Sequence, residues 1–219
     1  SANAAAVLEP DETAWVDLRR HRVALNDRDA NLFAVANQPA NFHLSHRHCP
    51  ACGSPTVVGL GGWARSCFND QKQVFPRTDP AVIVAVTDSG DRILLGSQGV
   101  WEENRWSILA GFVEAGESLT AAVTREVHEE ASVVVHDIQY LGSQSWPFPY
   151  SLMVGFSAKL DESIPNQEIK PDGLEIAKLR WFTRDEIAVG YQSGELIMPG
   201  PLTIARSLIE HWFGGPLDG

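Results

Sequence analysis

The chain has 219 residues, of which 44% are hydrophobic and 21% are charged, and its formal net charge is −11. This composition is typical of one globular domain with or without a small module, and it excludes a disordered or fibrous chain. The negative charge argues against nucleic acid or an anionic membrane as the main partner, and no run is apolar enough to span a bilayer. The three cysteines are clustered, which favours a reduced cytoplasmic protein over a disulfide scaffold.

The first segment spans residues 1–45, and its residues 1–40 are rich in alanine and are predicted to be largely helical. Asp29 can cap a short helix that runs through Ala36 and ends near Gln38-Pro39. We expect this segment to be a remnant or a shortened N-terminal region, because it is too small to form a complete domain.

Residues 46–77 contain a Cys-x-x-Cys knuckle, followed by a third cysteine and then an aspartate. Two such knuckles form a zinc ribbon, but here the second has lost its last cysteine. The pattern leaves two interpretations open: a zinc site completed by another residue, or a relic whose thiols are simply buried. The four knuckle residues are Cys49, Cys52, Cys67 and Asp70, and the other candidates for the fourth ligand are His43, His46 and His48.

Residues 78–213 show alternating strand and helix patterns, which predict an α/β sandwich with a mixed sheet. A capping-box pattern begins a helix at Thr183, and an amphipathic helix is expected at Pro201–Phe213. The expected strands are Ala81–Thr87, Arg92–Gly96, Trp106–Val113, Ile138–Trp146, Ser151–Leu160 and Leu179–Phe182.

The segment Gly111–Val133 carries three carboxylates at i, i+3 and i+4 on a helix expected between Ser118 and Ser132. Two of them project close to the apolar stripe of this helix, where like charges repel and resist desolvation. A divalent cation such as Mg²⁺ or Mn²⁺ would make the cluster tolerable. The carboxylates are those of Glu126, Glu129 and Glu130, and the stripe consists of Leu119, Val123 and Val127.

A second motif, Ser143–Ser151, places two prolines and two bulky aromatic side chains at a turn between strands. The aromatic side chains of Trp146 and Phe148 could stack on a flat heterocycle. The simpler interpretation is a rigid turn whose aromatic side chains fill the core, and the residues alone favour it.

The spacing over Gly111–Val133 resembles the Nudix box, with Ser132 in place of its last Gly. The run Ser143–Ser151 resembles the signature of the NADH pyrophosphatase branch of the Nudix hydrolases, with Ser145 in place of its first Pro. The order of knuckle, box and aromatic run is also similar to that branch. The resemblance implies a Nudix α/β/α sandwich preceded by a small zinc-ribbon-like module, with divisions at 1–45, 46–77 and 78–213.

The same resemblance implies metal-dependent cleavage of NADH or NAD⁺ to nicotinamide mononucleotide and AMP, and removal of the NAD cap from RNA. It implies that Glu126, Glu129, Glu130 and Glu175 hold Mg²⁺ or Mn²⁺. As a mechanistic hypothesis, we expect Glu129 or Glu130 to help deprotonate the attacking water. It assigns Glu117 and Arg125 to shaping the box by ion pairing. The substrate-binding residues that it implies are Phe112, Phe75, Trp146, Phe148, Glu175 and Ala205.

Members of this branch are homodimers with shared sites, so we expect a homodimer in the cytoplasm. One alternative is a pyrophosphatase for ADP-ribose or another nucleoside diphosphate, and another is a non-catalytic module that senses a dinucleotide. A nucleic-acid-binding ribbon is a further alternative, but its basic residues are too sparse for a strong patch. These basic residues are Arg47, Arg65, Lys72 and Arg77.

Overall fold

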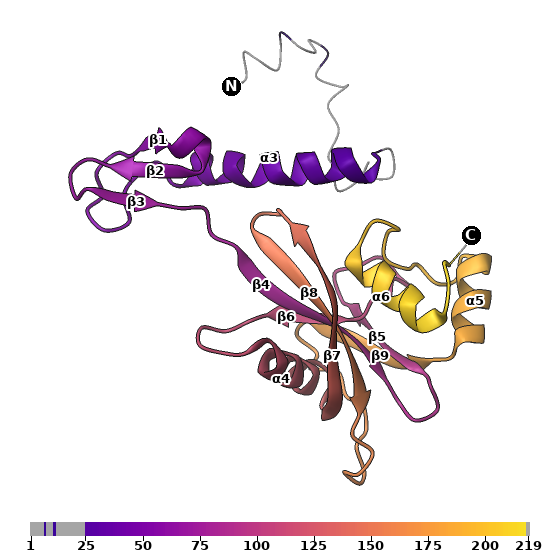
Figure 1. Cartoon of the computed structure of the whole chain (residues 1–219). Coiled ribbons are helices and arrows are strands. Elements are labelled where there is room, and N and C mark those ends of the chain that lie inside the picture. Colours follow the sequence, from indigo (N-terminus) through magenta and orange to yellow (C-terminus); the bar gives the residue numbers. More distant parts are fainter. Residues whose placement is uncertain (1–6, 8–10, 12–24, 218–219) are drawn as a thin grey trace.

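The computed structural model of the chain describes residues 7, 11 and 25–217. A three-stranded ribbon module and the helix α3 lie beside a larger sheet that has helices on both faces (Figure 1). The mixed α/β architecture and the small N-terminal module expected from the sequence are therefore confirmed. None of the described helices is long and apolar enough to cross a membrane.

Helix α3 (Asp27–Ser45) differs from the short helix expected in the first segment, about half of which lies outside the described residues. Its cap is the side chain of Asn26, which accepts from the backbone N–H of Asp29, so the expected cap at Asp29 is wrong. The helix also continues past Pro39 to Ser45, although proline removes one hydrogen bond of the helix. Contacts with the turn that follows Trp146 stabilise this second half of the helix, and sequence periodicity does not reveal them.

The ribbon module is an antiparallel sheet with strand order β1-β2-β3. Its strands are β1 (Val57–Gly59), β2 (Ala64–Cys67) and β3 (Lys72–Val74), and the short helix η3 (Leu60–Gly62) connects β1 to β2. A short extended segment then leads from β3 directly into the central strand of the larger sheet (Figure 1).

The larger sheet has the order β7-β8-β4-β5-β9, and β6 pairs with β4. Strands β4 and β8 run parallel over nine paired residues, from Asp79 opposite Ser151 to Thr87 opposite Lys159, and the other pairs are antiparallel. The strands are β4 (Asp79–Thr87), β5 (Ile93–Gln98), β6 (Leu109–Phe112), β7 (Val135–Trp146), β8 (Ser151–Leu160) and β9 (Ile176–Phe182).

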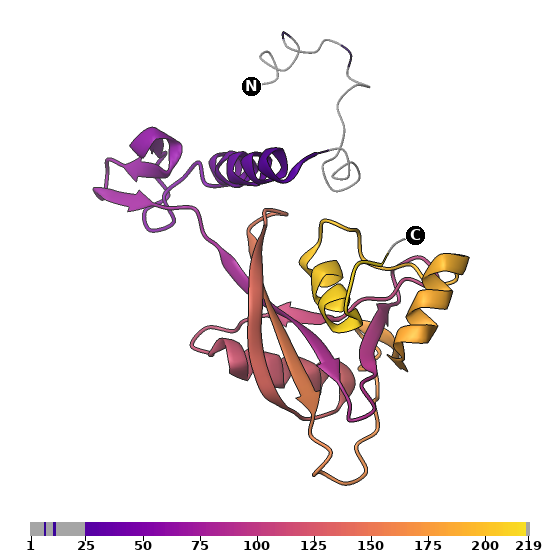
Figure 2. The same ribbon diagram turned by 45° about the vertical axis from the view of Figure 1, so that its right-hand side comes forward.

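Strand β4 is apolar at every central position because the sheet is covered on both faces. Val82, Val84 and Val86 point into the core beneath helix α4 (Leu119–Ala131), whereas Ile83 and Ala85 point into a second core. That second core lies under α5 (Arg184–Ser193) and α6 (Ile204–Phe213), on the opposite side of the sheet from α4 (Figure 2).

Helix boundaries follow the expected capping residues. Ser118 caps α4, Ser132 ends it in the left-handed conformation with φ of 60°, and Thr183 forms a complete capping box at the start of α5. Leu119 was expected to be buried with Val123 and Val127, and this is wrong, because the first residue of the helix is 38% exposed. The buried face of α4 instead includes Glu130, which is 4% exposed.

Candidate active site and ribbon metal centre

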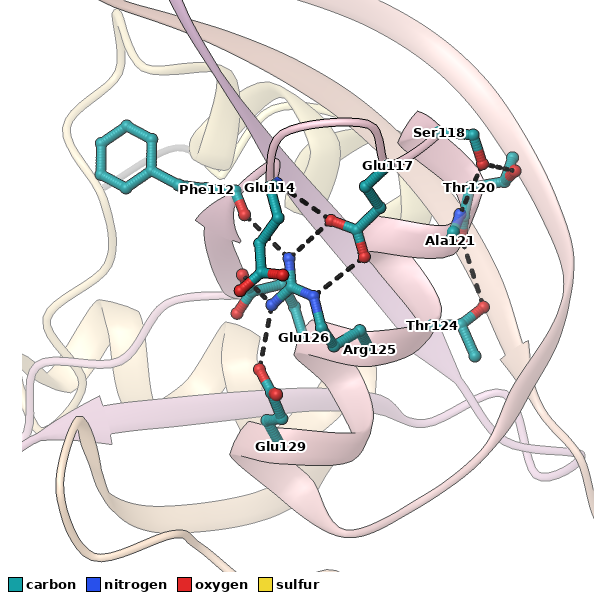
Figure 3. Close-up of polar contacts among 10 residues, drawn as sticks. All are labelled: Phe112, Glu114, Glu117, Ser118, Thr120, Ala121, Thr124, Arg125, Glu126 and Glu129. Atoms are coloured by element: carbon teal, nitrogen blue, oxygen red, sulfur yellow. Dashed lines mark hydrogen bonds and ion pairs between the residues drawn. The ribbon is translucent and has the colours of Figure 1, made fainter.

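Arg125 is the centre of the polar network on the box helix (Figure 3). Its guanidinium donates to both carboxylate oxygens of Glu117, at 2.9 and 2.8 Å, and to the backbone carbonyl of Phe112 at 2.9 Å. It also donates to Glu126 at 2.7 Å and to Glu129 at 2.9 Å. The hydrogen bonds with Glu117 and then Glu126 raise the pKa of Arg125, and Arg125 lowers the pKa of Glu117. The pairing of Glu117 with Arg125 is therefore present in the structure.

Glu126 lies against the backbone of β6, where only glycine leaves room for it. A Cβ atom on Gly111 would be 1.9 Å from Cδ of Glu126 and would overlap its carboxylate. The Glu126 side chain is only 13% exposed, and this burial raises its pKa despite the opposing effect of Arg125. The first residue of the motif therefore has a geometric purpose, which is to admit a carboxylate beside the sheet.

Glu130 is the most buried carboxylate of the cluster. Burial, followed by the charges of Glu126, Glu175 and Asp172, raises its pKa to about 8, while a backbone hydrogen bond from Ala110 acts in the opposite direction. Its Oε2 atom is buried and has no hydrogen-bond partner among the described residues. A buried, unsatisfied carboxylate oxygen is costly, and a divalent cation is a partner of suitable charge and chemistry.

Glu175 reaches this cluster from the loop before β9, whereas Glu129 is on the exposed side of α4. The loop is ordered by Asp172, whose carboxylate accepts from the backbone N–H groups of Leu174, Glu175 and Ile176. Asp172 was missed at the sequence level, although an aspartate directly before Gly173 is a common turn signal. The charges of Glu175 and Asp172 act on Glu130, so the loop and the helix share one negatively charged site.

The aromatic residues expected to bind a base are not all in one place. Trp146 and Ala205 line the same cavity of about 780 Å³, between β7, α6 and the loop after β5. Phe148 lies outside this lining and packs edge-on against Trp146, with the ring centroids 5.4 Å apart. Phe112 and Phe75 are 59% and 57% exposed and do not line the cavity, and the ring of Phe112 points away from the Arg125 network (Figure 3).

Several residues that line this cavity were not singled out from the sequence. Trp101 and Trp106 come from the loop after β5, where isolated tryptophans carry no motif, and Met198 and Thr203 come from the segment before α6. Their spacing in the chain is too wide for any sequence pattern to indicate that they meet.

In the ribbon module, the four knuckle residues form a compact cluster of the kind that could hold a metal ion. One potential ligand atom from each of Cys49, Cys52, Cys67 and Asp70 lies within 4.8 Å of the others. The sulfur atoms of Cys52 and Cys67 are 3.6 Å apart, close to the roughly 3.8 Å edge of a tetrahedron around zinc with bonds of 2.3 Å. Within residues 25–217, this is the one group of three or more ligand side chains gathered so closely.

The structure distinguishes between the candidates for the fourth position of this cluster. Asp70 belongs to the cluster and accepts from the thiol of Cys49 at 3.2 Å. His43 instead bonds to the carbonyl of Gly62, and neither it nor the other two histidines is part of the group. The donor set of three sulfur atoms and one carboxylate suits zinc.

Comparison with known proteins agrees with both parts of the structure. Residues 77–198 match the NUDIX domain, and residues 44–75 match the NADH pyrophosphatase zinc ribbon domain. The chain is 42% identical to the NAD-capped RNA hydrolase NudC of Mycobacterium tuberculosis over 94% of this chain and 68% of that protein. It is 36% identical to the human NAD-capped RNA hydrolase NUDT12 over 86% of this chain and 42% of that protein.

A solved structure shows the same fold at lower sequence identity. The crystal structure of a NUDIX hydrolase from Nitrosomonas europaea is 21% identical, with a TM-score of 0.58 over 78% of this chain and 94% of that one. Together with the matched domains and the curated relatives, the site geometry leads to one conclusion: the chain belongs to the Nudix hydrolase family and carries the zinc ribbon of NADH pyrophosphatases.

Proposed function

We propose that the chain hydrolyses the pyrophosphate bond of NADH or NAD⁺ to nicotinamide mononucleotide and AMP, and that it removes the NAD cap from RNA. The observation that carries the proposal is the buried Oε2 atom of Glu130, which has no hydrogen-bond partner within the described part of the chain and lies in the field of the Glu126 and Glu175 charges. The relatives named NAD-capped RNA hydrolases support the choice of substrate.

Glu126, Glu129, Glu130 and Glu175 would hold Mg²⁺ or Mn²⁺, whose charge offsets that of the pyrophosphate and makes phosphorus more electrophilic when bound. Water adds to phosphorus as the bridging oxygen leaves, and Glu129 or Glu130 accepts the proton of that water. Arg125 is held by its hydrogen bond to Glu117 and in turn holds Glu126 and Glu129 in position.

The base of the dinucleotide would bind in the cavity lined by Trp146 and Ala205, with Phe148 supporting Trp146 from outside. The rings of Phe112 and Phe75 are exposed, so they are available to stack on the bases of the substrate and would complete the binding site. A ring from the ribbon module can serve such a site from a second copy of the chain, and we therefore propose a homodimer.

The dimer is supported by exposed apolar side chains on the ribbon module, among them Trp63 at 56% and Phe68 at 78%. Light scattering at micromolar concentration is expected to give twice the mass of 24.0 kDa. A monomeric mass would contradict the proposal. The three cysteines are all free in the structure, which supports a reducing compartment such as the cytoplasm.

Product analysis tests the reaction directly. The full chain is incubated with NADH, NAD⁺, NAD-capped RNA and ADP-ribose, with and without Mn²⁺, and the products are separated. We expect nicotinamide mononucleotide and AMP from the dinucleotides, only with the metal ion. Faster cleavage of ADP-ribose than of any NAD-containing substrate would favour the other pyrophosphatases, and binding without cleavage would favour a sensor.

Replacement of one carboxylate tests the assignment of the site. Glu130→Gln is expected to lower kcat by about 10³-fold, because it removes a carboxylate that would both bind the metal ion and accept a proton. The chain should remain folded, since the change removes a buried charge. Glu195→Gln, at an exposed glutamate outside the site, is the control and should be neutral. Near-native turnover by Glu130→Gln would refute the assignment.

A further inference from the structure

Helix α3 is attached to the aromatic turn between β7 and β8 by polar side chains. The Asn37 amide donates to the carbonyl of Pro147 at 2.8 Å, and the Asn41 amide approaches the same oxygen at 3.5 Å. One helical turn further on, the hydroxyls of Ser45 and Tyr150 are 2.7 Å apart. Both ribbon views show α3 lying across the tip of the β7–β8 hairpin (Figures 1 and 2).

Within the turn, the N–H of Phe148 donates to the carbonyl of Trp146 at 2.7 Å, which leaves the Pro147 carbonyl for donors outside the turn. Pro147 has no N–H group, so its carbonyl is the one backbone atom through which hydrogen bonds can fix it. Pro147 is buried, and its carbonyl oxygen accepts from α3. Asn37 therefore makes the shorter of the two hydrogen bonds that satisfy this buried acceptor, and the longer one comes from Asn41.

Pro147 directly follows a residue of the candidate binding cavity. Trp146 lines the cavity of about 780 Å³ together with Met153 and Ala205, and its ring packs edge-on against Phe148. A displacement of the Pro147 carbonyl would change the backbone between these two aromatic residues. The position of the Trp146 ring at the cavity wall is thus linked to the Asn37 side chain.

We propose that Asn37 is a positioning residue for dinucleotide binding, acting by holding the Pro147 carbonyl and thereby the Trp146 ring. The inference rests on the proposed function, since it names a further residue for the same cavity. Asn37 lies outside the segments that match the zinc ribbon and NUDIX domains, residues 44–75 and 77–198. The site would therefore depend on an element that belongs to neither matched domain.

The helix offers a matched control for this residue. Asn31 is also an asparagine of α3, it is exposed, and its side chain makes no hydrogen bond within the described part of the chain. Alanine is a better helix former than asparagine, so neither Asn37→Ala nor Asn31→Ala should unfold the helix. Asn37→Asp keeps the shape but places a carboxylate oxygen against the carbonyl oxygen.

The first measurement is made on the full chain with NAD⁺ and NADH. The Kd for NAD⁺ is measured without added Mg²⁺ or Mn²⁺, and KM and kcat for NADH with Mn²⁺. Asn37→Ala is expected to raise Kd and KM about fivefold to tenfold, because one hydrogen bond is lost. Its kcat should stay within twofold of the wild-type value. Asn37→Asp should have an effect at least as large, and Asn31→Ala should match the wild type. Equal Kd values for Asn37→Ala and Asn31→Ala would overturn the proposal.

The second measurement does not depend on any substrate. The chain is labelled with 5-fluorotryptophan, and the ¹⁹F resonance of Trp146 is assigned by its disappearance in Trp146→Phe. Asn37→Ala is expected to shift or broaden this resonance, and Asn31→Ala is not. An unchanged resonance alongside normal cleavage of NADH would overturn only the role of Asn37. A wild-type chain that neither binds nor cleaves a dinucleotide would overturn the proposed function and this role together.

Discussion

The two clusters of ligand side chains are built in opposite ways. In the ribbon module, three sulfur atoms and one carboxylate oxygen lie within 4.8 Å of one another. In the Nudix domain, the carboxylates come from a helix and a distant loop, and Arg125 bonds to two of them. The first cluster is already shaped for an ion, whereas the second is partly occupied by a side chain of the protein itself.

The difference arises because local backbone hydrogen bonds shape the first cluster, whereas packing between distant elements shapes the second. The knuckle is shaped by local backbone hydrogen bonds, from Cys49 N–H to the Ser54 carbonyl at 2.8 Å and from Gly53 N–H to the Cys49 carbonyl at 2.9 Å. The position of Glu126 on helix α4 depends instead on a close approach to Gly111 of strand β6. The ribbon cluster therefore rests on local backbone geometry, whereas the carboxylate cluster depends on tertiary packing.

Among the changes that should affect one cluster and spare the other, Gly111→Ala is expected to have the largest effect. The added Cβ would overlap the carboxylate of Glu126, whose flexible side chain must then rotate away from its site. Because small misplacements of catalytic groups cost about 10²-fold in rate, kcat for NADH should fall by about that factor. Zinc content should not change. Gly142→Ala is the control, since a Cβ there meets nothing within 4 Å. Equal rates for the two variants would show that the close approach is unimportant.

An intermediate effect is expected at Asp70, the proposed fourth ligand of the ribbon. Elemental analysis should give about one zinc per chain, and Asp70→Asn should weaken zinc binding at least tenfold, because the anionic oxygen is lost. The affinity of the Nudix domain for Mn²⁺ should stay the same in this variant. Asp185→Asn, at an exposed aspartate of α5, serves as the control. A zinc content near zero in wild-type protein would reject the site.

The smallest expected effect is a dependence of Mn²⁺ stabilisation on pH. The pKa of Glu130 is raised from 4.5 to about 8, so between these pH values the unfolded chain has lost a proton that the folded chain keeps. The free energy of unfolding without metal therefore falls as pH rises through this window, by up to about 1.4 kcal/mol per pH unit. Mn²⁺ binds the deprotonated carboxylate, so it should raise Tm by a few degrees more at pH 8 than at pH 5.5.

The Glu130→Gln variant provides the comparison for this measurement. With no proton to lose at position 130, the gain in Tm on addition of Mn²⁺ should be small at both pH values. An equal gain at pH 5.5 and pH 8 in the wild-type chain would mean that Glu130 does not lose a proton when the ion binds.

Local features of the chain could be predicted from the sequence because their causes lie within a few residues. The strand Ser151–Leu160 has the expected bounds, the capping box at Thr183 is formed, and Ser132 has the left-handed conformation expected where the motif has glycine. The pairing of Arg125 with Glu117 followed from the family pattern and is also present.

Features that depend on distant contacts could not be predicted in this way. The true length of α3 depends on bonds to a turn that is 110 residues away from Asn37. The cavity combines loops whose residues have no common motif, and the role of Asp172 in ordering the loop of Glu175 becomes visible only when its three backbone donors are known. The catalytic and substrate-binding roles and the divisions at residues 45 and 77 stay predictions.

The attachment of α3 also affects where a shortened fragment for crystallography or screening should begin. A fragment that begins at residue 77, where the match to the NUDIX domain starts, would lack the partners of the Pro147 carbonyl and the Tyr150 hydroxyl. A fragment that begins before Asn26 would keep the cap of α3 and every one of these bonds. Measurements on the shorter fragment would therefore report on a rearranged aromatic wall, even if the sheet beneath it folded normally.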